Sequence, residues 1–168
     1  QRKSESIGSG NYPKARGDLL KRFQTDEKGK RTQLAQVYTS AEHGITRGGI
    51  AHEALTVTRR LSRAGYEAYI VGGAIRDLLV GKDPKDYDIA TDAHPRVVRR
   101  LFRRSRIIGR RFQLVHVYVS ENTIEVSTFR ADPAQNALNA DGRDASPFGT
   151  MAEDVRRRDF TMNALYYD

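Results

Sequence analysis

The chain has 168 residues, enough for one domain with a substantial core and too few for two comfortable ones. Its net charge of +8 favours a polyanionic partner such as nucleic acid over a neutral metabolite. The lack of cysteine excludes disulfides and thiolate zinc sites and fits a cytoplasmic location. No apolar run approaches the roughly 20 residues of a membrane helix, and the N-terminus is polar, so neither a membrane span nor a secretory signal is expected.

Residues 1–37 are rich in Lys, Arg, Ser, Gly and Gln and contain few large apolar side chains. Such a segment cannot bury enough surface to offset its ordering entropy, so we predict a flexible basic N-terminal extension. A folded domain is expected over residues 38–168. The sequence leaves open whether the extension touches RNA, and it gives no indication of the oligomeric state.

Hydrophobic periodicity and turn residues predict alternating helices and strands in the folded domain. Helices are expected at residues 50–64, 74–80 and 95–104 and after the Thr150–Glu153 capping box, and strands at 67–71, 86–90, 112–119 and 123–129. The strand at 112–119 is almost entirely apolar or aromatic, which is typical of a covered central strand. Residues 131–149 are polar and predict a long mobile loop.

Two aspartates, Asp86 and Asp88, lie two residues apart on a predicted strand and therefore share one face of it. Glu125 lies on a neighbouring predicted strand, with parity opposite to its apolar neighbours, so it can face the same side of the sheet. Three carboxylates on one face make an oxygen-only site suited to two Mg²⁺ ions, with Mn²⁺ as an alternative. Taken alone, the two aspartates could equally be polar residues of a turn.

The pair Gly72-Gly73 separates a predicted strand from a predicted short helix, where backbone N–H groups can approach a phosphate. Arg76 falls one turn into that helix and could bind a phosphate through two hydrogen bonds. The alternatives are a tight turn that binds nothing and an ordinary salt bridge from Arg76 to Asp77 or to Asp86 or Asp88.

Arginines crowd residues 96–111 and are candidates for contact with the RNA backbone. The candidates are Arg96, Arg99, Arg100 and Arg103, which form a stripe on the predicted helix, together with Arg110 and Arg111. The alternative is a solvated charged face. His116 lies in the apolar strand, where a core histidine is expected.

Four segments in this order resemble the head domain of class II nucleotidyltransferases, the bacterial poly(A) polymerases and tRNA CCA-adding enzymes. They are Val71-Gly72-Gly73-Ala74-Ile75-Arg76-Asp77-Leu78-Leu79, Pro84-Lys85-Asp86-Tyr87-Asp88, Glu125-Val126-Ser127-Thr128-Phe129-Arg130 and Arg157-Arg158-Asp159-Phe160-Thr161-Met162-Asn163-Ala164-Leu165. The resemblance implies an α+β head of the polymerase-β type, with a small mixed β-sheet flanked by helices. Family members continue into neck, body and tail domains that this sequence does not contain.

The resemblance also implies roles for individual residues. Asp86, Asp88 and Glu125 would be the catalytic metal ligands, and Gly72, Gly73, Arg76 and Arg158 would hold the triphosphate of ATP. Asp159 and Asn163 would organise the same site.

The segment Ile107–Val117 resembles the one that distinguishes bacterial poly(A) polymerases from CCA-adding enzymes. We therefore expect template-independent addition of AMP from ATP to RNA 3′ ends by a two-metal mechanism. The nearest alternative is CCA addition to tRNA, and a second alternative is a non-catalytic RNA-binding module.

Overall fold

The computed structural model describes residues 20–25, 29, 31–110, 112–131 and 147–168. The chain divides into two compact units, one over residues 1–45 and one over residues 46–168. Each unit is described by itself below.

The first unit contains a β-hairpin followed by one helical turn. Strand β1 (Leu20–Thr25) pairs antiparallel with β2 (Arg31–Val37), and α1 (Ser40–His43) follows. Gly29, between the strands, has a φ of +77°, which a glycine adopts without strain. Strands β1 and β2 lie within residues 1–37, where a flexible extension is predicted, and residues such as Thr32 and Val37 favour extended backbone. Residues 1–19 of that predicted extension lie outside the described residues.

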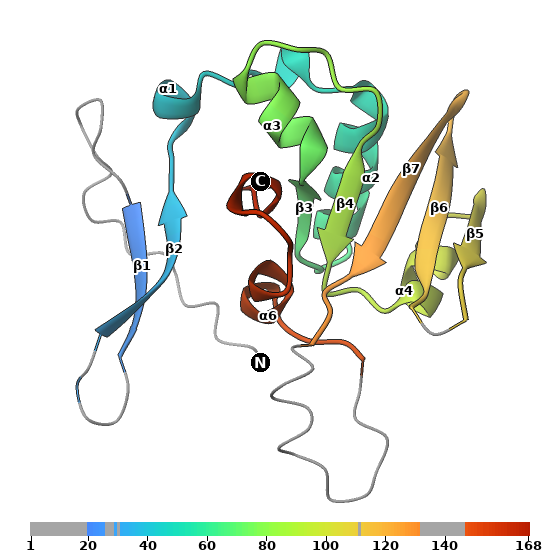
Figure 1. Ribbon diagram of the computed structural model, residues 1–168. Coiled ribbons are helices and arrows are strands. Elements are labelled where there is room, and N and C mark those ends of the chain that lie inside the picture. Colours follow the sequence, from blue (N-terminus) through green and yellow to red (C-terminus); the bar gives the residue numbers. More distant parts are fainter. Residues whose placement is uncertain (1–19, 26–28, 30, 111, 132–146) are drawn as a thin grey trace, which may run out of the picture. The chain divides into compact units, whose positions relative to one another are not determined.

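The described residues of the second unit form a mixed six-stranded sheet in the order β5-β6-β7-β4-β3-β8 (Figure 1). The strands are β3 (Ala68–Val71), β4 (Asp88–Thr91), β5 (Ser105–Ile108), β6 (Leu114–Val119), β7 (Asn122–Thr128) and β8 (Tyr166–Tyr167). Strands β4 and β7 are parallel, and the other neighbours are antiparallel.

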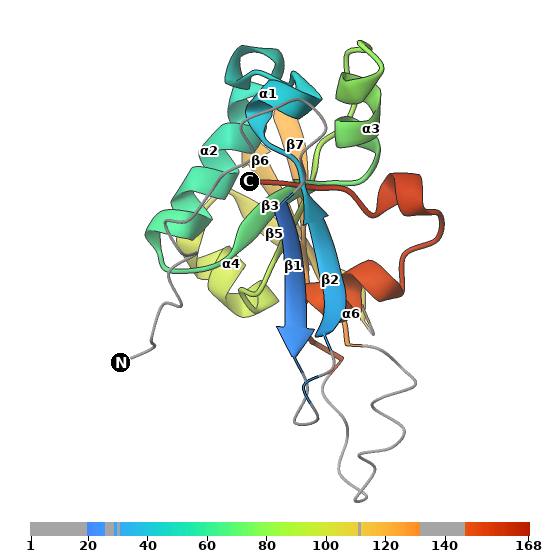
Figure 2. The ribbon, with the colours of Figure 1, turned by 90° about the vertical axis from the view of Figure 1, so that its left-hand side faces the viewer.

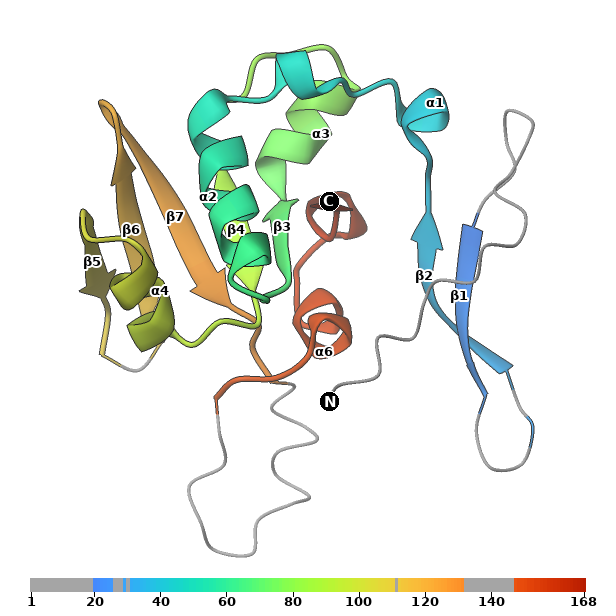
Figure 3. The same ribbon diagram turned by 180° about the vertical axis from the view of Figure 1, so that it is seen from behind.

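Helices cover the sheet on both sides (Figure 2). They are α2 (His52–Arg63), α3 (Gly73–Leu79), α4 (Pro95–Leu101) and α6 (Met151–Arg156), with 3₁₀ turns η1 (Arg47–Gly49) and η2 (Thr161–Asn163). Helices α2 and α4 lie together on one side, which faces the viewer in Figure 3, and α6 lies on the other. A mixed sheet flanked by helices confirms the predicted α+β class.

The sheet face under α2 and α4 is the larger part of the core. Ile70, Ile89, Val126 and Val115 are cross-strand neighbours in register, and each is at most 1% exposed. Since such neighbours point to the same face, they form one apolar row across four strands. Helix α2 contributes buried Ala54, Val57 and Leu61 and contacts β3, β4 and β7.

The opposite face has a smaller apolar cluster of Val71, Ala90 and Phe129. Tyr69, Met151 and Tyr166 pack against this cluster. Asp88 and Glu125 point to this same face, because Asp88 is the cross-strand partner of Val71 and lies beside Glu125. The cluster thus supports a face that also carries the candidate carboxylates.

The predicted elements are confirmed with shifted ends, and β5, β8 and α1 were not predicted. The strand predicted at 86–90 begins at Asp88, so Asp86 precedes it. Strand β6 is not covered on both faces as predicted, because Val115 and Val117 are buried while Tyr118 is 37% exposed. Of the loop predicted at 131–149, residues 132–146 lie outside the described residues. None of the helices in the described part of the chain has the length and apolar character of a membrane span.

Candidate active site

The glycine turn between β3 and α3 has a backbone conformation that only glycine adopts readily. Gly72 has φ +72° and ψ −131°, and its N–H donates to the Leu165 carbonyl oxygen at 3.1 Å. A Cβ added here would lie 3.8 Å from the Asn163 carbonyl oxygen and 3.9 Å from Arg158 Nη1. The C-terminal segment thus lies directly against the turn, which brings Arg158 and Asn163 to Gly72 as the resemblance implied.

Asp88 and Glu125 lie side by side on the parallel strands β4 and β7. Burial and the adjacent Glu125 carboxylate raise the pKa of Asp88, and Asp86 adds to this effect while Arg158 opposes it. Tyr87 and Ile89 are both buried, and Ile89 lies on the other face, in register with Ile70 and Val126. The predicted shared face of Asp88 and Glu125 is therefore confirmed, and the two negative charges repel each other.

This donor set fits a divalent cation in chemistry. Carboxylate oxygens are the ligands that Mg²⁺ and Mn²⁺ prefer, and a cation would relieve the repulsion that raises the pKa of Asp88. Within the described residues, however, no three Asp, Glu, His or Cys side chains converge closely enough to form a metal site. Asp88 and Glu125 are neighbours across β4 and β7, the third predicted ligand, Asp86, precedes the strand, and both aspartates are exposed.

Arg76 makes the salt bridge that the sequence left as an alternative. Its Nε and Nη2 donate to Asp77 Oδ1 at 3.0 and 2.9 Å, and its Nη1 donates to Asn163 Oδ1 at 3.2 Å. The guanidinium also lies near Gly73, where an added Cβ would be 3.5 Å from Nη2. Arg76, the glycine pair and Asn163 are therefore one constellation, and 41% exposure leaves the Arg76 side chain accessible to a ligand.

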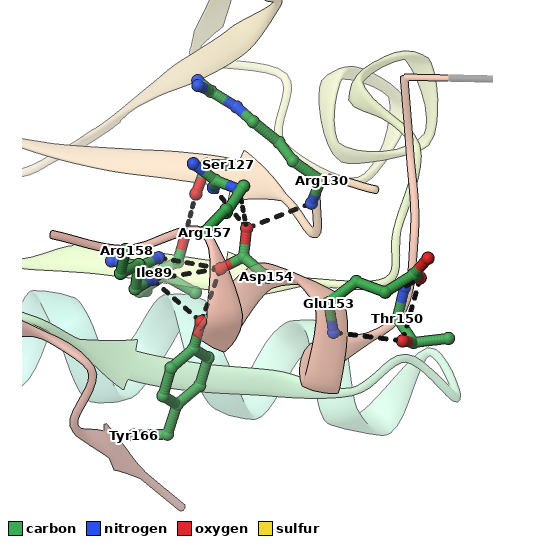
Figure 4. Close-up of polar contacts among 9 residues, drawn as sticks. All are labelled: Ile89, Ser127, Arg130, Thr150, Glu153, Asp154, Arg157, Arg158 and Tyr166. Atoms are coloured by element: carbon green, nitrogen blue, oxygen red, sulfur yellow. Dashed lines mark hydrogen bonds and ion pairs between the residues drawn. The ribbon is translucent and has the colours of Figure 1, made fainter. Parts of the chain in front are cut away.

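Asp154 is the centre of a polar network that sequence analysis missed (Figure 4). Its carboxylate is 1% exposed and accepts hydrogen bonds from two arginines, a tyrosine and a backbone amide. The donors are Arg130 N at 3.0 Å, Arg157 Nε at 2.9 Å together with Arg157 Nη2, Arg158 Nε and Nη2 at 3.1 and 2.9 Å, and Tyr166 OH at 2.5 Å.

The electrostatics of this network favour a charged Asp154. Burial alone would raise the pKa of Asp154, but the hydrogen bonds from Tyr166, Arg130 N and Arg157 lower it on balance. Burial and the bond to Asp154 raise the pKa of Tyr166, so its hydroxyl stays protonated. Arg158 also donates to Tyr166 OH at 2.9 Å and lies over its ring at 5.2 Å from the centroid. Asp154 thus holds Arg158 between the glycine turn and Asp88.

Two residues differ from their expected surroundings. Asp159 is exposed and makes no hydrogen bond or ion pair with the described residues. His116 was expected in the core, and this is wrong: its side chain is 34% exposed, and Nε2 lies 3.7 Å from Glu125 Oε2. The error arose because β6 is buried on one face only, and the sequence did not reveal which.

The candidate RNA-binding arginines fall into two groups. Arg96, Arg99 and Arg100 lie on α4 and Arg103 follows it; all are exposed, but α4 lies across the sheet from α6 (Figure 2). Within the stripe, Arg99 Nη1 donates to the Phe102 and Arg103 carbonyl oxygens at 3.4 and 3.2 Å. Arg110 is exposed between β5 and β6, and Arg111 lies outside the described residues. The structure does not bring Arg96, Arg99, Arg100 or Arg103 to the candidate site.

Comparisons with known proteins identify the family. Residues 68–168 match the poly A polymerase head domain. The chain belongs to this family. A poly(A) polymerase I of Salmonella typhi is 49% identical over 136 residues, which are 75% of this chain and 29% of that protein. The poly(A) polymerase I of Haemophilus influenzae is 41% identical over 165 residues, which are 93% of this chain and 35% of that protein.

CCA-adding enzymes are also similar to this head domain. The one from Geobacillus kaustophilus is 43% identical over 116 residues, 69% of this chain and 28% of that protein. Among solved structures, the Bacillus stearothermophilus CCA-adding enzyme in complex with CTP matches with a TM-score of 0.58 and 39% identity, covering 69% of this chain and 27% of that one. The fold predicted from the four motifs is thereby confirmed. The chain spans only about a third of the length of the curated relatives it matches.

Proposed function

We propose that this head domain serves a full-length enzyme that transfers AMP from ATP to RNA 3′-hydroxyl groups without a template, releasing pyrophosphate. The observation that carries the proposal is the pair Asp88–Glu125, which lies on one sheet face beside the Gly72 turn and Arg158. The identity of 49% and 41% to two poly(A) polymerases supports ATP and RNA as the substrates.

The carboxylates Asp86, Asp88 and Glu125 would hold two Mg²⁺ ions, or Mn²⁺. When bound, the ions would neutralise charge on the triphosphate and lower the pKa of the attacking hydroxyl. This assignment is supported by the oxygen-only donors and by the repulsion between Asp88 and Glu125.

The remaining residues of the site bind and orient the triphosphate. Gly72 and Gly73 allow phosphate oxygens to approach the backbone, since neither carries a side chain that would cover it. The guanidinium groups of Arg76 and Arg158 would bind phosphate oxygens through paired hydrogen bonds. Asn163 orients Arg76, to which it is already hydrogen-bonded, and Asp159 would assist at the same place.

Such a site works by positioning and electrostatics, because phosphoryl-type transfer needs little covalent participation by the protein. Arg110 and Arg111 would contact the RNA backbone near its 3′ end. The stripe Arg96, Arg99, Arg100 and Arg103 lies across the sheet and would contact more distant phosphates, if RNA wraps around this edge.

The test compares nucleotides and acceptors with the full-length protein. Labelled ATP or CTP is incubated with an oligo(A) primer or with a tRNA that lacks its 3′ end. Long tails made from ATP alone are expected. Termination after three nucleotides would favour CCA addition, the candidate supported by the 43% identical CCA-adding enzyme. RNA binding without incorporation would favour a non-catalytic RNA-binding module.

Asp88→Asn tests the carboxylate assignment directly. We expect loss of AMP incorporation by at least about a hundredfold with the thermal unfolding temperature retained, because removing a charge from a repelling pair does not weaken the fold. Glu121→Gln, an equivalent change in the exposed turn between β6 and β7, is the matched control and should leave activity unchanged. Near-normal tailing by Asp88→Asn would contradict the assignment.

A further inference from the structure

Phe112 and Arg130 form an exposed cation–aromatic pair on the carboxylate side of the sheet. The Arg130 guanidinium carbon lies 4.8 Å from the centroid of the Phe112 ring, and Phe112 is 49% exposed. Phe112 precedes β6, whose first residue Leu114 pairs with Ser127 of β7, and the Arg130 guanidinium that lies over the ring also interacts electrostatically with Glu125. The ring is therefore near the sheet face that carries Glu125.

Two different contacts fix the position of Arg130. Its backbone N–H is bound to Asp154, while Figure 4 shows its side chain pointing away from Asp154. Burial and the charge of Arg157 lower the pKa of Arg130, whereas the Asp154 and Glu125 carboxylates raise it. The guanidinium is thus within electrostatic reach of Glu125, and Asp154 anchors the backbone of Arg130.

The strand order places this pair opposite the glycine turn. Gly72 follows β3, Asp88 and Glu125 lie on β4 and β7, and Phe112 precedes β6, in the sheet order β6-β7-β4-β3. The pair is also at the far end of the strands: Gly72 extends past the Asp88 end of β4, while Arg130 follows the other end of the parallel β7. In the strand order, Asp88 and Glu125 lie between Gly72 and Phe112, while Asp154 binds both Arg130 N and Arg158.

This arrangement of the glycine turn, the carboxylates and the Phe112–Arg130 pair fits the geometry of in-line transfer. The attacking hydroxyl and the departing pyrophosphate must lie on opposite sides of the reacting phosphorus. With the triphosphate at the Gly72 turn, approach of the RNA 3′ end from the β6 side satisfies this requirement, because β6 and the Gly72 turn lie on opposite sides of the carboxylates in the strand order. A half-exposed aromatic ring covered by a guanidinium is a surface on which unpaired bases stack, and sequence-tolerant stacking is typical of single-stranded RNA sites.

We propose that Phe112 and Arg130 form a stacking site for the 3′-terminal base of the RNA acceptor, on the side of the carboxylates opposite to the Gly72 turn. This inference rests on the proposed function, since it places the acceptor of the same reaction. The exposed Arg110 lies in the adjoining turn and supplies a cation for the neighbouring phosphate.

The test measures binding of a fluorescent oligo(A) to the full-length protein in the absence of ATP, by fluorescence anisotropy. Phe112→Ala is expected to weaken binding about tenfold, the usual loss for one stacked base. Phe112→Trp, which keeps a stacking ring, should stay within about twofold. Arg130→Ala should weaken binding as well, whereas Arg60→Ala is the matched control, because Arg60 covers Phe102 at 5.2 Å in the α2–α4 layer.

An oligonucleotide that lacks only its 3′-terminal base distinguishes stacking from a general loss of affinity. The wild-type protein should bind this abasic oligonucleotide about tenfold more weakly, and Phe112→Ala should bind both oligonucleotides equally. The proposal would be overturned if Phe112→Ala weakened binding of both oligonucleotides equally or left binding unchanged. It would also be overturned if the substitution weakened ATP binding and not RNA binding. The binding assay contains no ATP, so its result is independent of the incorporation assay. Absence of AMP transfer by the wild type would refute the proposed function and would leave the binding result unaffected.

Discussion

Replacing Asp154 by Asn probes the interaction on which the candidate site depends. The substitution keeps the size of the side chain and removes its charge. In the protein, this 1% exposed carboxylate accepts bonds from Arg157, Arg158, Tyr166 and the backbone of Arg130. An asparagine presents only one oxygen, and its NH₂ group would face guanidinium donors. Two buried or half-buried arginines would then lose their anion.

The expected loss follows from the burial of the pair. Breaking a buried ion pair by removing one partner costs about 3–5 kcal/mol, and the remaining amide oxygen favours the lower end of that range. We expect the free energy of unfolding to fall by about 3 kcal/mol and the midpoint temperature by roughly 10 °C. ATP should also bind more weakly, because Arg158 loses the contact that directs it toward Gly72.

The pH dependence has a definite sign. The pKa of Asp154 is lowered in the folded protein, so its stabilisation is fully present above the ordinary carboxyl pKa and is lost as pH falls through the lowered value. The difference in stability between wild type and Asp154→Asn should therefore be constant from about pH 5 to 8 and shrink below about pH 4.

Urea unfolding followed by circular dichroism, at a series of pH values, measures both effects. Asp92→Asn is the matched control, since Asp92 is exposed and accepts one bond from Glu67 N at 2.8 Å. It should cost no more than about 1 kcal/mol. A loss for Asp154→Asn no larger than this, or one that grows in acid, would refute the reasoning.

Two further substitutions test local features. Gly72→Ala forces φ +72° on a residue with a Cβ and should cost about 1–3 kcal/mol while weakening ATP binding; unchanged stability and ATP affinity would show that the turn relaxes freely. Thr150→Ala removes the oxygen that accepts from Glu153 N at 3.3 Å and should lower the free energy of unfolding by about 1 kcal/mol in urea, with ATP affinity retained; no change in stability would argue that the capping box contributes nothing.

Local sequence patterns predicted the elements that position the carboxylates. A strand has a period of two residues, so the parity of Glu125 against Ile124 and Val126 was enough to assign its face. The capping box at Thr150 and the glycines at 72 and 73 are equally local, and each marks the start of a helix in the structure. Family motifs then supplied the order of these elements in a known fold.

Features that depend on distant partners were missed. Asp154 appeared as an ordinary residue of a short helix, because its partners Arg130 and Tyr166 are 24 and 12 residues away. Strand β8 is only two residues long, and pairing with β3 creates it. The two N-terminal strands were obscured by a polar composition, since backbone pairing does not require apolar side chains.

The sequence by itself determined the family, the fold class and the shared face of Asp88 and Glu125, because these depend on motifs and on the period of a strand. Only the tertiary structure decided that Asp154 orients Arg158, that His116 faces Glu125, and that the α4 arginines lie across the sheet from the site. The physical reason is that burial and hydrogen-bond partners are properties of the packed chain. The sequence gives the identity of each side chain, and the packing of the chain determines which side chains are in contact.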